Sequence, residues 1–308
     1  MGAAGFSHEV LFYDDDEEFL EGAVPLLRAG LEAGEPSLVA VRRSRSELLR
    51  AELGEDGEQV EFVEMEVVGR NPARIIPVWR DFIERAEPGL TVRGIGEPVW
   101  PGRDAAELEE CRRHERLLNL VFGRGREWTL LCPYDTGLDD EVLQLAYESH
   151  SHAHCHGSLI ESPGWLGNGN RYAPFAGVLP PPPDDATALE FERDELSSIR
   201  QLVGRETAAA SLPAARGSDL VAAVSELAAN SVIHGGGSGT LHVWREPGAF
   251  LVEVHDRGTI EQPLVGRLRP GLEQDGGRGL WMVNQLCDLV QIRSGPEGSG
   301  IRLRMNLS

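Results

Sequence analysis

The sequence predicts two α/β domains of different architecture. In the first half of the chain, short apolar runs alternate five times with longer amphipathic ones, beginning with HEVLFY and then DEEFLEGAVPLLRAGLEAG. In the last third, two helical patterns precede two pairs of short apolar runs. Between these parts lies a glycine- and proline-rich stretch that ends in Pro180 to Pro183. We therefore expect a first domain over residues 1–156, an extended, semi-rigid linker over 157–189 and a second domain over 190–308.

Each of the five N-terminal units predicts a strand followed by a helix, with apolar runs at 8–13, 37–41, 59–65, 90–95 and 128–134. Because crossover helices join parallel strands, this order predicts a doubly wound, mainly parallel sheet with helices on both faces. Ligands of such sheets bind beyond the carboxyl ends of the strands. The side chains expected at those ends are Asp14 to Asp16, Arg42, Glu64, Glu97, Trp100, Tyr134 and Asp135.

The C-terminal part predicts a two-layer α/β sandwich. Helical patterns occupy 192–210, 218–235 and 279–288, and strand patterns occupy 239–246, 249–256, 289–295 and 300–307. The first strand pair is joined by a Pro-Gly turn and the second by Pro-Glu-Gly. We expect the helices to cover one face of a mixed sheet.

Charge and composition exclude several classes of function. The 308 residues include 29 basic and 50 acidic side chains, for a net charge of −21, and every basic residue is arginine. Without lysine, a Walker-type P-loop and Schiff-base catalysis are both excluded. The acidity is concentrated in residues 1–189, which hold 17 arginines against 35 acids, whereas the rest holds 12 against 15.

The acidic balance argues against direct binding of nucleic acid or of an anionic membrane. No apolar run approaches the roughly 20 residues of a membrane span, and the first residues lack the basic and apolar segments of a secretion signal. We therefore expect a cytoplasmic protein. Its cysteines have no paired short spacings, so we expect reduced thiols at Cys111, Cys132, Cys155 and Cys287.

Two short motifs in the C-terminal part favour nucleotide chemistry. Glu226 and Asn230 lie four residues apart on a predicted helix and share one face. Buried there, this pair is costly unless it binds something polar, such as Mg²⁺ with phosphate oxygens, although the spacing also fits a solvated helix face. Asp256 ends a predicted strand near Gly258, where a carboxylate can accept a hydrogen bond from an exocyclic amine and a glycine lets a planar ring approach.

Two glycine motifs follow. Gly276 to Gly279, with Arg278 among them, immediately precede a predicted helix whose first N–H groups can bind phosphate. On its own this motif fits an ordinary loop-to-helix junction. Ser299 lies between two glycines near the start of the last predicted strand. The order of the four motifs is more specific than any one of them.

In this order the motifs resemble the Bergerat ATP-binding fold of histidine kinases, type II topoisomerases and Hsp90-type chaperones. Residues 190–308 resemble more closely the anti-sigma factor serine kinases of bacterial partner-switching systems, and GGRGLWMVNQLCD is the most specific string. The resemblance implies ATP and Mg²⁺ as cofactors. It implies that Asn230 ligates Mg²⁺, that Glu226 is the catalytic general base and that Asp256 binds the adenine amine.

The same resemblance implies that Gly258 flanks the base, that Gly277 and Gly279 shape a lid, and that Ser299 supports the adenine end. Arg278 either contacts phosphate or is a solvated lid residue, and His234 is either a functional histidine or a helix cap. Residues 259–263 lack the proline-rich continuation common in that family, so ATP binding is a stronger expectation than turnover.

The first domain resembles the MEDS sensory domain, which has a degenerate resemblance to RecA/KaiC-like folds, over about residues 6–150. The segments HEVLFYDDDEEFLEGAVPLLRAGLEAGEPSLVAV, GEPVWPGRDAAELEECRRHERLLNLVF and LCPYDTGLDDEVL carry the resemblance. It implies that this domain senses an unknown small-molecule ligand. Fused to an anti-sigma-type ATPase domain, it implies a bacterial stress-response regulator of transcription.

Other residues have two interpretations. His150, His152, His154 and His156 would project from one face of an extended segment and could bind Zn²⁺ or Ni²⁺, or they form an exposed helix end that continues into the linker. His114 followed by an acid resembles the phospho-acceptor of a histidine kinase, but a buried or capping role is favoured. Trp79 and Trp100 could line a sensory pocket, although tryptophans at such spacings are more often core residues.

The sequence therefore predicts an anti-sigma regulatory protein that binds Mg-ATP and a sigma factor. Serine phosphorylation of an anti-sigma factor antagonist, modulated by the sensory domain, is a further expectation. One alternative is a non-catalytic ATP-binding partner-switch module, and another is a sensor histidine kinase. Because related ATPase domains pair, we also expect a possible homodimer.

Overall fold

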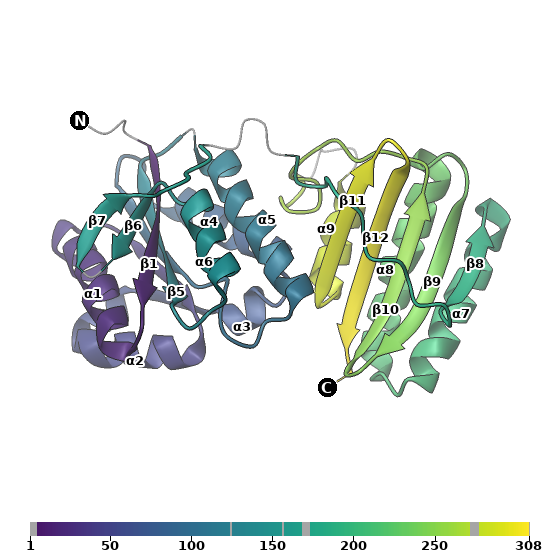
Figure 1. The fold of residues 1–308 in the computed structure, drawn as a ribbon, viewed down its shortest axis with the longest axis horizontal. Helices are drawn as coiled ribbons and strands as arrows, with labels where there is room; N and C mark the ends of the chain where they lie inside the picture. Colours follow the sequence, from purple (N-terminus) through teal and green to yellow (C-terminus); the bar gives the residue numbers. More distant parts are fainter. Residues whose placement is uncertain (1–4, 124, 156, 168–172, 272–276, 308) are drawn as a thin grey trace. The chain divides into compact units, whose positions relative to one another are not determined.

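The computed structural model describes residues 5–123, 125–155, 157–167, 173–271 and 277–307. The chain divides into two compact units, Met1–Tyr172 and Ala173–Ser308, and Figure 1 shows the fold of each.

The first unit is built on a seven-stranded sheet with the strand order β3-β2-β4-β5-β1-β6-β7. All neighbouring strands are parallel except β6 and β7, which form an antiparallel pair at one edge. The strands are β1 (Phe6–Tyr13), β2 (Ser37–Val41), β3 (Glu61–Glu64), β4 (Val92–Gly96), β5 (Trp128–Asp135), β6 (His152–Cys155) and β7 (Ser158–Glu161). The prediction of a mainly parallel sheet is confirmed.

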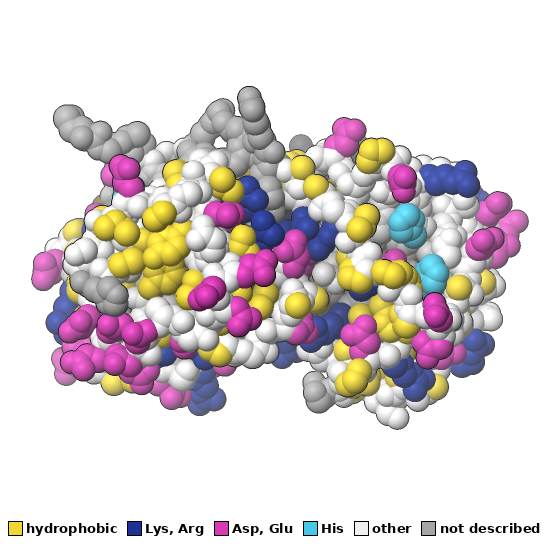
Figure 2. All heavy atoms as spheres, in the orientation of Figure 1, with side chains coloured by type: hydrophobic (Ala, Val, Ile, Leu, Met, Phe, Trp, Pro, Cys, Tyr) yellow, Lys and Arg dark blue, Asp and Glu magenta, His cyan; other side chains and the backbone are white. Residues whose placement is uncertain are grey.

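Helices cover both faces of this sheet, as the prediction of a doubly wound fold requires. The helices are α1 (Asp16–Ala33), α2 (Arg43–Leu53), α3 (Met65–Val68), α4 (Ile75–Arg85), α5 (Ala105–Phe122) and α6 (Asp140–Ser149), with short 3₁₀ turns at Gly54–Gln59 and Pro72–Arg74. On one face, Phe19 of α1 and Leu49 of α2 pack with Leu11 of β1 and Val39 of β2. In the surface view of Figure 2, acidic side chains gather over α1 and α2.

The opposite face carries α4 and α5. Trp79 of α4 is buried against Gly94 and Gly96 of β4, where an added Cβ would come within 2.9 and 2.8 Å of the indole ring. Trp79 is therefore a core residue. Trp100 instead stacks beneath the guanidinium of Arg103, which lies 3.6 Å from its ring centroid.

The second unit contains a five-stranded sheet with the order β11-β12-β10-β9-β8. Its strands are β8 (Thr187–Phe191), β9 (Gly239–Glu246), β10 (Ala249–Asp256), β11 (Leu289–Gly295) and β12 (Gly298–Asn306). Its helices are α7 (Leu196–Ala209), α8 (Ala214–His234) and α9 (Arg278–Leu286), after a 3₁₀ turn at Arg193–Glu195. The helices lie on one face, which confirms the two-layer sandwich (Figure 1).

The expectation of a mixed second sheet is wrong, because every strand pair described in it is antiparallel. Tight turns join β9 to β10 and β11 to β12, and β12 then pairs antiparallel with β10. This register places Asp256 at the end of β10 directly opposite Ser299 near the start of β12. Two of the predicted site residues, 43 positions apart in the chain, therefore share one end of the sheet.

The stretch expected as a linker contributes to both sheets. Ser158–Glu161 is the edge strand β7 of the first sheet, and Thr187–Phe191 is the edge strand β8 of the second. Between them, Phe175 is buried in the core of the second unit, and the carbonyl of Pro180 accepts a hydrogen bond from Arg302. The first proline of the run is thus hydrogen-bonded to the second unit. No helix within the described residues combines the length and apolarity that crossing a bilayer requires.

Candidate functional site

A cavity of about 600 Å³ in the second unit lies between α8, the end of β10 and the start of α9. All eight residues expected to form a nucleotide site line it: Glu226, Asn230, Asp256, Gly258, Gly277, Arg278, Gly279 and Ser299. His234, the last residue of α8, also lines this cavity. The structure thus brings the four separate sequence motifs to one place.

The carboxylate of Glu226 and the amide of Asn230 lie side by side on α8. Asn230 Nδ2 donates to Glu226 Oε1 at 3.3 Å, and the helix buries its other side in the core. An added Cβ at Gly279, in the first turn of α9, would collide with the Glu226 carboxylate. The start of α9 is therefore in direct contact with the acid, and a larger residue at position 279 would displace the Glu226 side chain.

Asp256 is held at the other side of the cavity by two hydrogen bonds. Its Oδ2 accepts from the hydroxyl of Ser231 at 2.6 Å, and its Oδ1 accepts from the backbone N–H of Gly258 at 2.8 Å. Gly235 packs against this carboxylate, since an added Cβ would lie 2.7 Å from Oδ2. A carboxylate has about four acceptor positions, so Asp256 retains acceptor capacity toward the cavity.

Two hydroxyls behind Asp256 fix the loop that follows it. Ser299 Oγ donates to the carbonyl of Gly258 at 2.8 Å and lies 2.8 Å from Ser294 Oγ. Ser294 Oγ in turn accepts from the backbone N–H of Ile260 at 2.7 Å. Sequence reasoning missed Ser231 and Ser294, although Ser231 directly follows Asn230 on the helix.

Apolar side chains line the wall between the polar groups: Leu227, Val254, Ile260, Val265, Leu280 and Ile301. A mostly apolar wall with a few fixed polar groups is typical of a small-molecule site, and an apolar slot suits a planar base. The N-terminus of α9 also borders the cavity, and its N-cap residue Gly277 has a positive φ of 80° and makes no side-chain cap. The first N–H groups of α9 can therefore bind an anion.

Two known protein families match separate parts of the chain. Residues 7–151 match the family model MEDS, described as methanogen/methylotroph, DcmR sensory domain. Residues 189–305 match the model of the histidine kinase-like ATPase domain. The chain contains a MEDS domain and a histidine kinase-like ATPase domain.

A partial likeness to one solved structure accompanies these matches. The RsbU and RsbW domains of Rv1364c from Mycobacterium tuberculosis share 20% sequence identity with this chain at a TM-score of 0.30. The alignment covers 39% of this chain and 32% of that one. A search of curated proteins found no match.

In the MEDS domain, the strand ends expected to hold a ligand are partly occupied by internal contacts. Arg42, after β2, forms an ion pair with the buried Glu97, after β4, at 2.8 Å. The hydroxyl of Tyr13, at the end of β1, donates to the same carboxylate at 3.4 Å. Burial raises the pKa of Tyr13 to about 12, so its phenol stays protonated near neutral pH. A different cavity, of about 250 Å³, lies between α5 and α6.

The histidine tract of the MEDS domain does not present its described imidazoles on one face. His154 in β6 contacts Glu9 of β1 at 2.6 Å, whereas the ring of His150 lies 4.0 Å from that of His8. His8 and Glu9 are neighbours in a strand and project to opposite faces, so His150 and His154 lie on opposite sides of the sheet. A bend at Ser151 causes the difference.

The remaining candidate histidines are His152 and His156 of the tract and His114 of α5. His152 is half-buried in β6, its Nδ1 lies 3.0 Å from Ser151 Oγ, and His156 lies outside the described residues. His114 of α5 is buried at 1% exposure, as the favoured alternative predicted. An imidazole in the core of the MEDS domain is not accessible to a kinase active site.

His150 instead joins a buried group that sequence reasoning missed, composed of His8, Glu115, Cys132 and His150. Burial lowers the pKa of His8 to about 4 and that of His150 to about 3. Burial also raises the pKa of Glu115 and holds the pKa of Cys132 well above its usual value. The two imidazoles are therefore neutral near neutral pH.

Proposed function

We propose that the histidine kinase-like ATPase domain binds Mg-ATP in the 600 Å³ cavity and that the chain is an anti-sigma regulator. The observation that carries the proposal is the arrangement of the cavity. A fixed carboxylate, Asp256, lies on one side of an apolar wall, and Glu226, Asn230 and a helix N-terminus border the other. This order of groups suits a nucleotide with an amine at one end and phosphates at the other.

The adenine would lie against the apolar wall with its exocyclic amine donating to Asp256. Gly258 carries no side chain where the base would approach, and its backbone is fixed by Ser299. Asn230 offers an amide oxygen of the kind that Mg²⁺ accepts, while the ATP phosphates supply further oxygens. Bound Mg²⁺ would neutralise phosphate charge, and this task needs no lysine.

Phosphoryl transfer to a serine of an anti-sigma factor antagonist is the catalytic part of the proposal. The Glu226 carboxylate lies against Gly279 in the first turn of α9, and as general base it would accept the proton of the attacking hydroxyl. The order of the two domains supports three further parts of the proposal. These are binding of a sigma factor, binding of an antagonist, and modulation by a small molecule at the MEDS domain. The 250 Å³ cavity between α5 and α6 is the candidate site for that ligand.

A non-catalytic role as an ATP-binding partner-switch module is the second candidate. It is favoured by the packing of Glu226, which accepts from Asn230 and lies against Gly279 as a structural part of the wall. A sensor histidine kinase is less well supported, because His114 is buried.

The partners can be tested by affinity capture from native cell extract. Immobilised full-length protein with Mg-ATP is expected to retain a sigma factor or a small antagonist, and Asp256→Ala is expected to retain less of it. Mass spectrometry identifies the captured proteins. Recovery of neither partner class, or equal recovery by the variant without ATP binding, would contradict nucleotide-dependent partner switching.

A further inference from the structure

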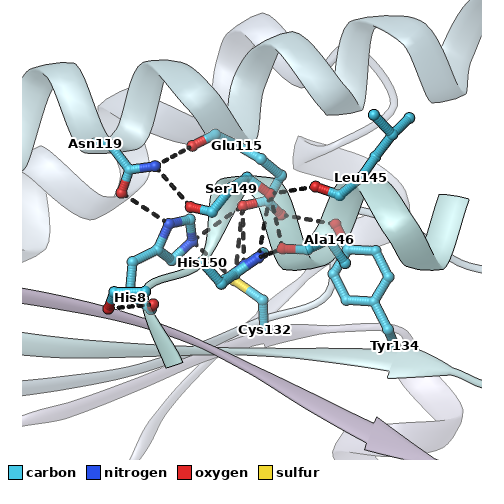
Figure 3. A network of polar contacts seen from close by, with 10 residues as sticks. His8, Glu115, Asn119, Cys132, Tyr134, Leu145, Ala146, Ser149 and His150 are labelled. Carbon is cyan, nitrogen blue, oxygen red and sulfur yellow. Dashed lines mark hydrogen bonds and ion pairs between the residues drawn. The ribbon is translucent and has the colours of Figure 1, made fainter. Parts of the chain in front are cut away.

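Four side chains of the MEDS domain, of types that can ligate a metal, converge on one buried point, shown in Figure 3. His8 comes from β1, Glu115 from α5, Cys132 from β5, and His150 directly follows α6. Each is at most 1% exposed, and their ligand atoms all lie within 4.8 Å of one another.

Four of the six spacings between the ligand atoms are close to those of a tetrahedral metal site. Glu115 Oε2 lies 3.0 Å from His8 Nε2, 3.4 Å from His150 Nε2 and 3.9 Å from Cys132 Sγ. Cys132 Sγ lies 3.4 Å from His8 Nε2. Zinc bonds of about 2.0 Å to nitrogen and about 2.3 Å to sulfur, directed to the corners of a tetrahedron, separate ligand atoms by roughly 3.3–3.7 Å. These four spacings bracket that range, and the other two pairs lie within 4.8 Å.

The protonation of His150 is set by its surroundings. Its Nδ1 lies 2.7 Å from the carbonyl oxygen of Ala146, which can only accept, so Nδ1 carries the proton. Nε2 therefore has a lone pair, and it makes no hydrogen bond although the residue is fully buried. This nitrogen lies 3.4 Å from Glu115 Oε2.

His8 is held in the same tautomer by a second contact. Its Nδ1 lies 3.1 Å from Asn119 Oδ1, and the Asn119 amide is oriented because its Nδ2 donates to the carbonyl of Ser149 at 2.7 Å. The proton of His8 is thus on Nδ1, and the lone pair of Nε2 points toward Glu115 and Cys132. Ligating histidines typically donate their other ring N–H to a carbonyl or carboxylate in this way.

Two imidazole lone pairs that face a buried carboxylate oxygen repel it unless a cation or a proton lies between them. The other oxygen of Glu115 is occupied, because it accepts from the Tyr134 hydroxyl at 3.4 Å. A divalent ion bound by one carboxylate, one thiolate and two neutral imidazoles has no net charge. Such a neutral centre avoids the cost of burying an unpaired charge.

We propose that His8, Glu115, Cys132 and His150 bind a divalent transition-metal ion of the zinc class in the MEDS domain. Two nitrogens, one sulfur and one oxygen are the donor set that zinc accepts, whereas calcium and magnesium require oxygen ligands. Glu115, Tyr134 and Ser149 also line the 250 Å³ cavity between α5 and α6. One of the four proposed ligands, Glu115, therefore borders a cavity next to the cluster.

Metal content of the purified full-length protein tests this proposal. After growth with zinc and gel filtration, elemental analysis is expected to find about one zinc per chain. Cys132→Ser and His150→Ala are expected to lose that zinc. Cys111→Ser is the matched control, because Cys111 is equally buried on α5 and donates to the carbonyl of Pro98 outside the cluster. It is expected to retain the metal.

A cobalt titration keeps the test decisive if a core variant fails to fold. Metal-stripped wild-type protein is expected to develop thiolate-to-cobalt absorption that saturates at about one Co²⁺ per chain. Folded wild-type protein with neither zinc nor cobalt absorption would overturn the proposal, because a shared proton would then bridge the cluster. Metal content unchanged in a folded Cys132→Ser variant would overturn it equally.

Discussion

Asp256→Ala is expected to weaken ATP binding by about 10- to 100-fold, because it removes the only carboxylate in β10 that lines the cavity. A hydrogen bond to a charged acceptor contributes about 1.5–3 kcal/mol, and about 1.4 kcal/mol corresponds to a factor of ten in affinity. Equilibrium titration of the full-length variant with ATP in the presence of Mg²⁺ measures the effect.

His255→Ala is the matched control for this variant. His255 precedes Asp256 in β10 and is exposed on the opposite face of the sheet, so its loss leaves the cavity intact. ATP affinity equal to wild type in Asp256→Ala, or an equal loss in both variants, would show that Asp256 does not bind the base.

Glu226→Gln is expected to reduce serine phosphorylation of a captured antagonist by about 10²- to 10⁴-fold, which is the usual contribution of a general base. Glutamine keeps the size of the side chain and its contact with Gly279 but cannot take the proton of the attacking hydroxyl. ATP binding is therefore expected to stay near the wild-type value. Transfer of labelled γ-phosphate to the antagonist measures the rate.

Asp219→Asn controls for charge on the same helix, since Asp219 lies two turns before Glu226 and away from the cavity lining. Phosphorylation unchanged by Glu226→Gln would show that another group takes the proton. Loss of the labelled phosphate from the protein in acid would instead support a histidine kinase, because phosphohistidine is acid-labile and phosphoserine is acid-stable.

Local patterns in the sequence singled out eight residues that line the 600 Å³ cavity. The helical spacing of Glu226 and Asn230, the acid that ends β10 and the glycines before α9 are each visible within a few residues. Their meeting in one cavity depends on the pairing of β10 with β12, which local pattern does not specify. Ser294 could not be predicted for the same reason, because its hydroxyl contacts Ser299 on the neighbouring strand and the backbone N–H of Ile260, 34 residues earlier.

The buried group of the MEDS domain could not be predicted in the same way. His8 and Cys132 are 124 residues apart and meet only because β1 lies beside β5 in the sheet. The histidine tract from His150 to His156 indicated instead a metal site on one extended segment. The bend at Ser151 removes His150 from that segment. Residues 187–189 of β8 were expected in the linker, since the strand is only five residues long and begins four residues after Pro183.

The most direct test of ATP binding is a calorimetric titration of full-length wild-type protein with ATP and with GTP, each with Mg²⁺. We predict saturable ATP binding at about one site per chain, at least about tenfold tighter than GTP and weakened by EDTA. Guanine places a carbonyl oxygen where adenine has its amine, and that oxygen would face the Asp256 carboxylate. Absence of ATP binding, or equal affinity for the two nucleotides, would contradict the assignment of this cavity.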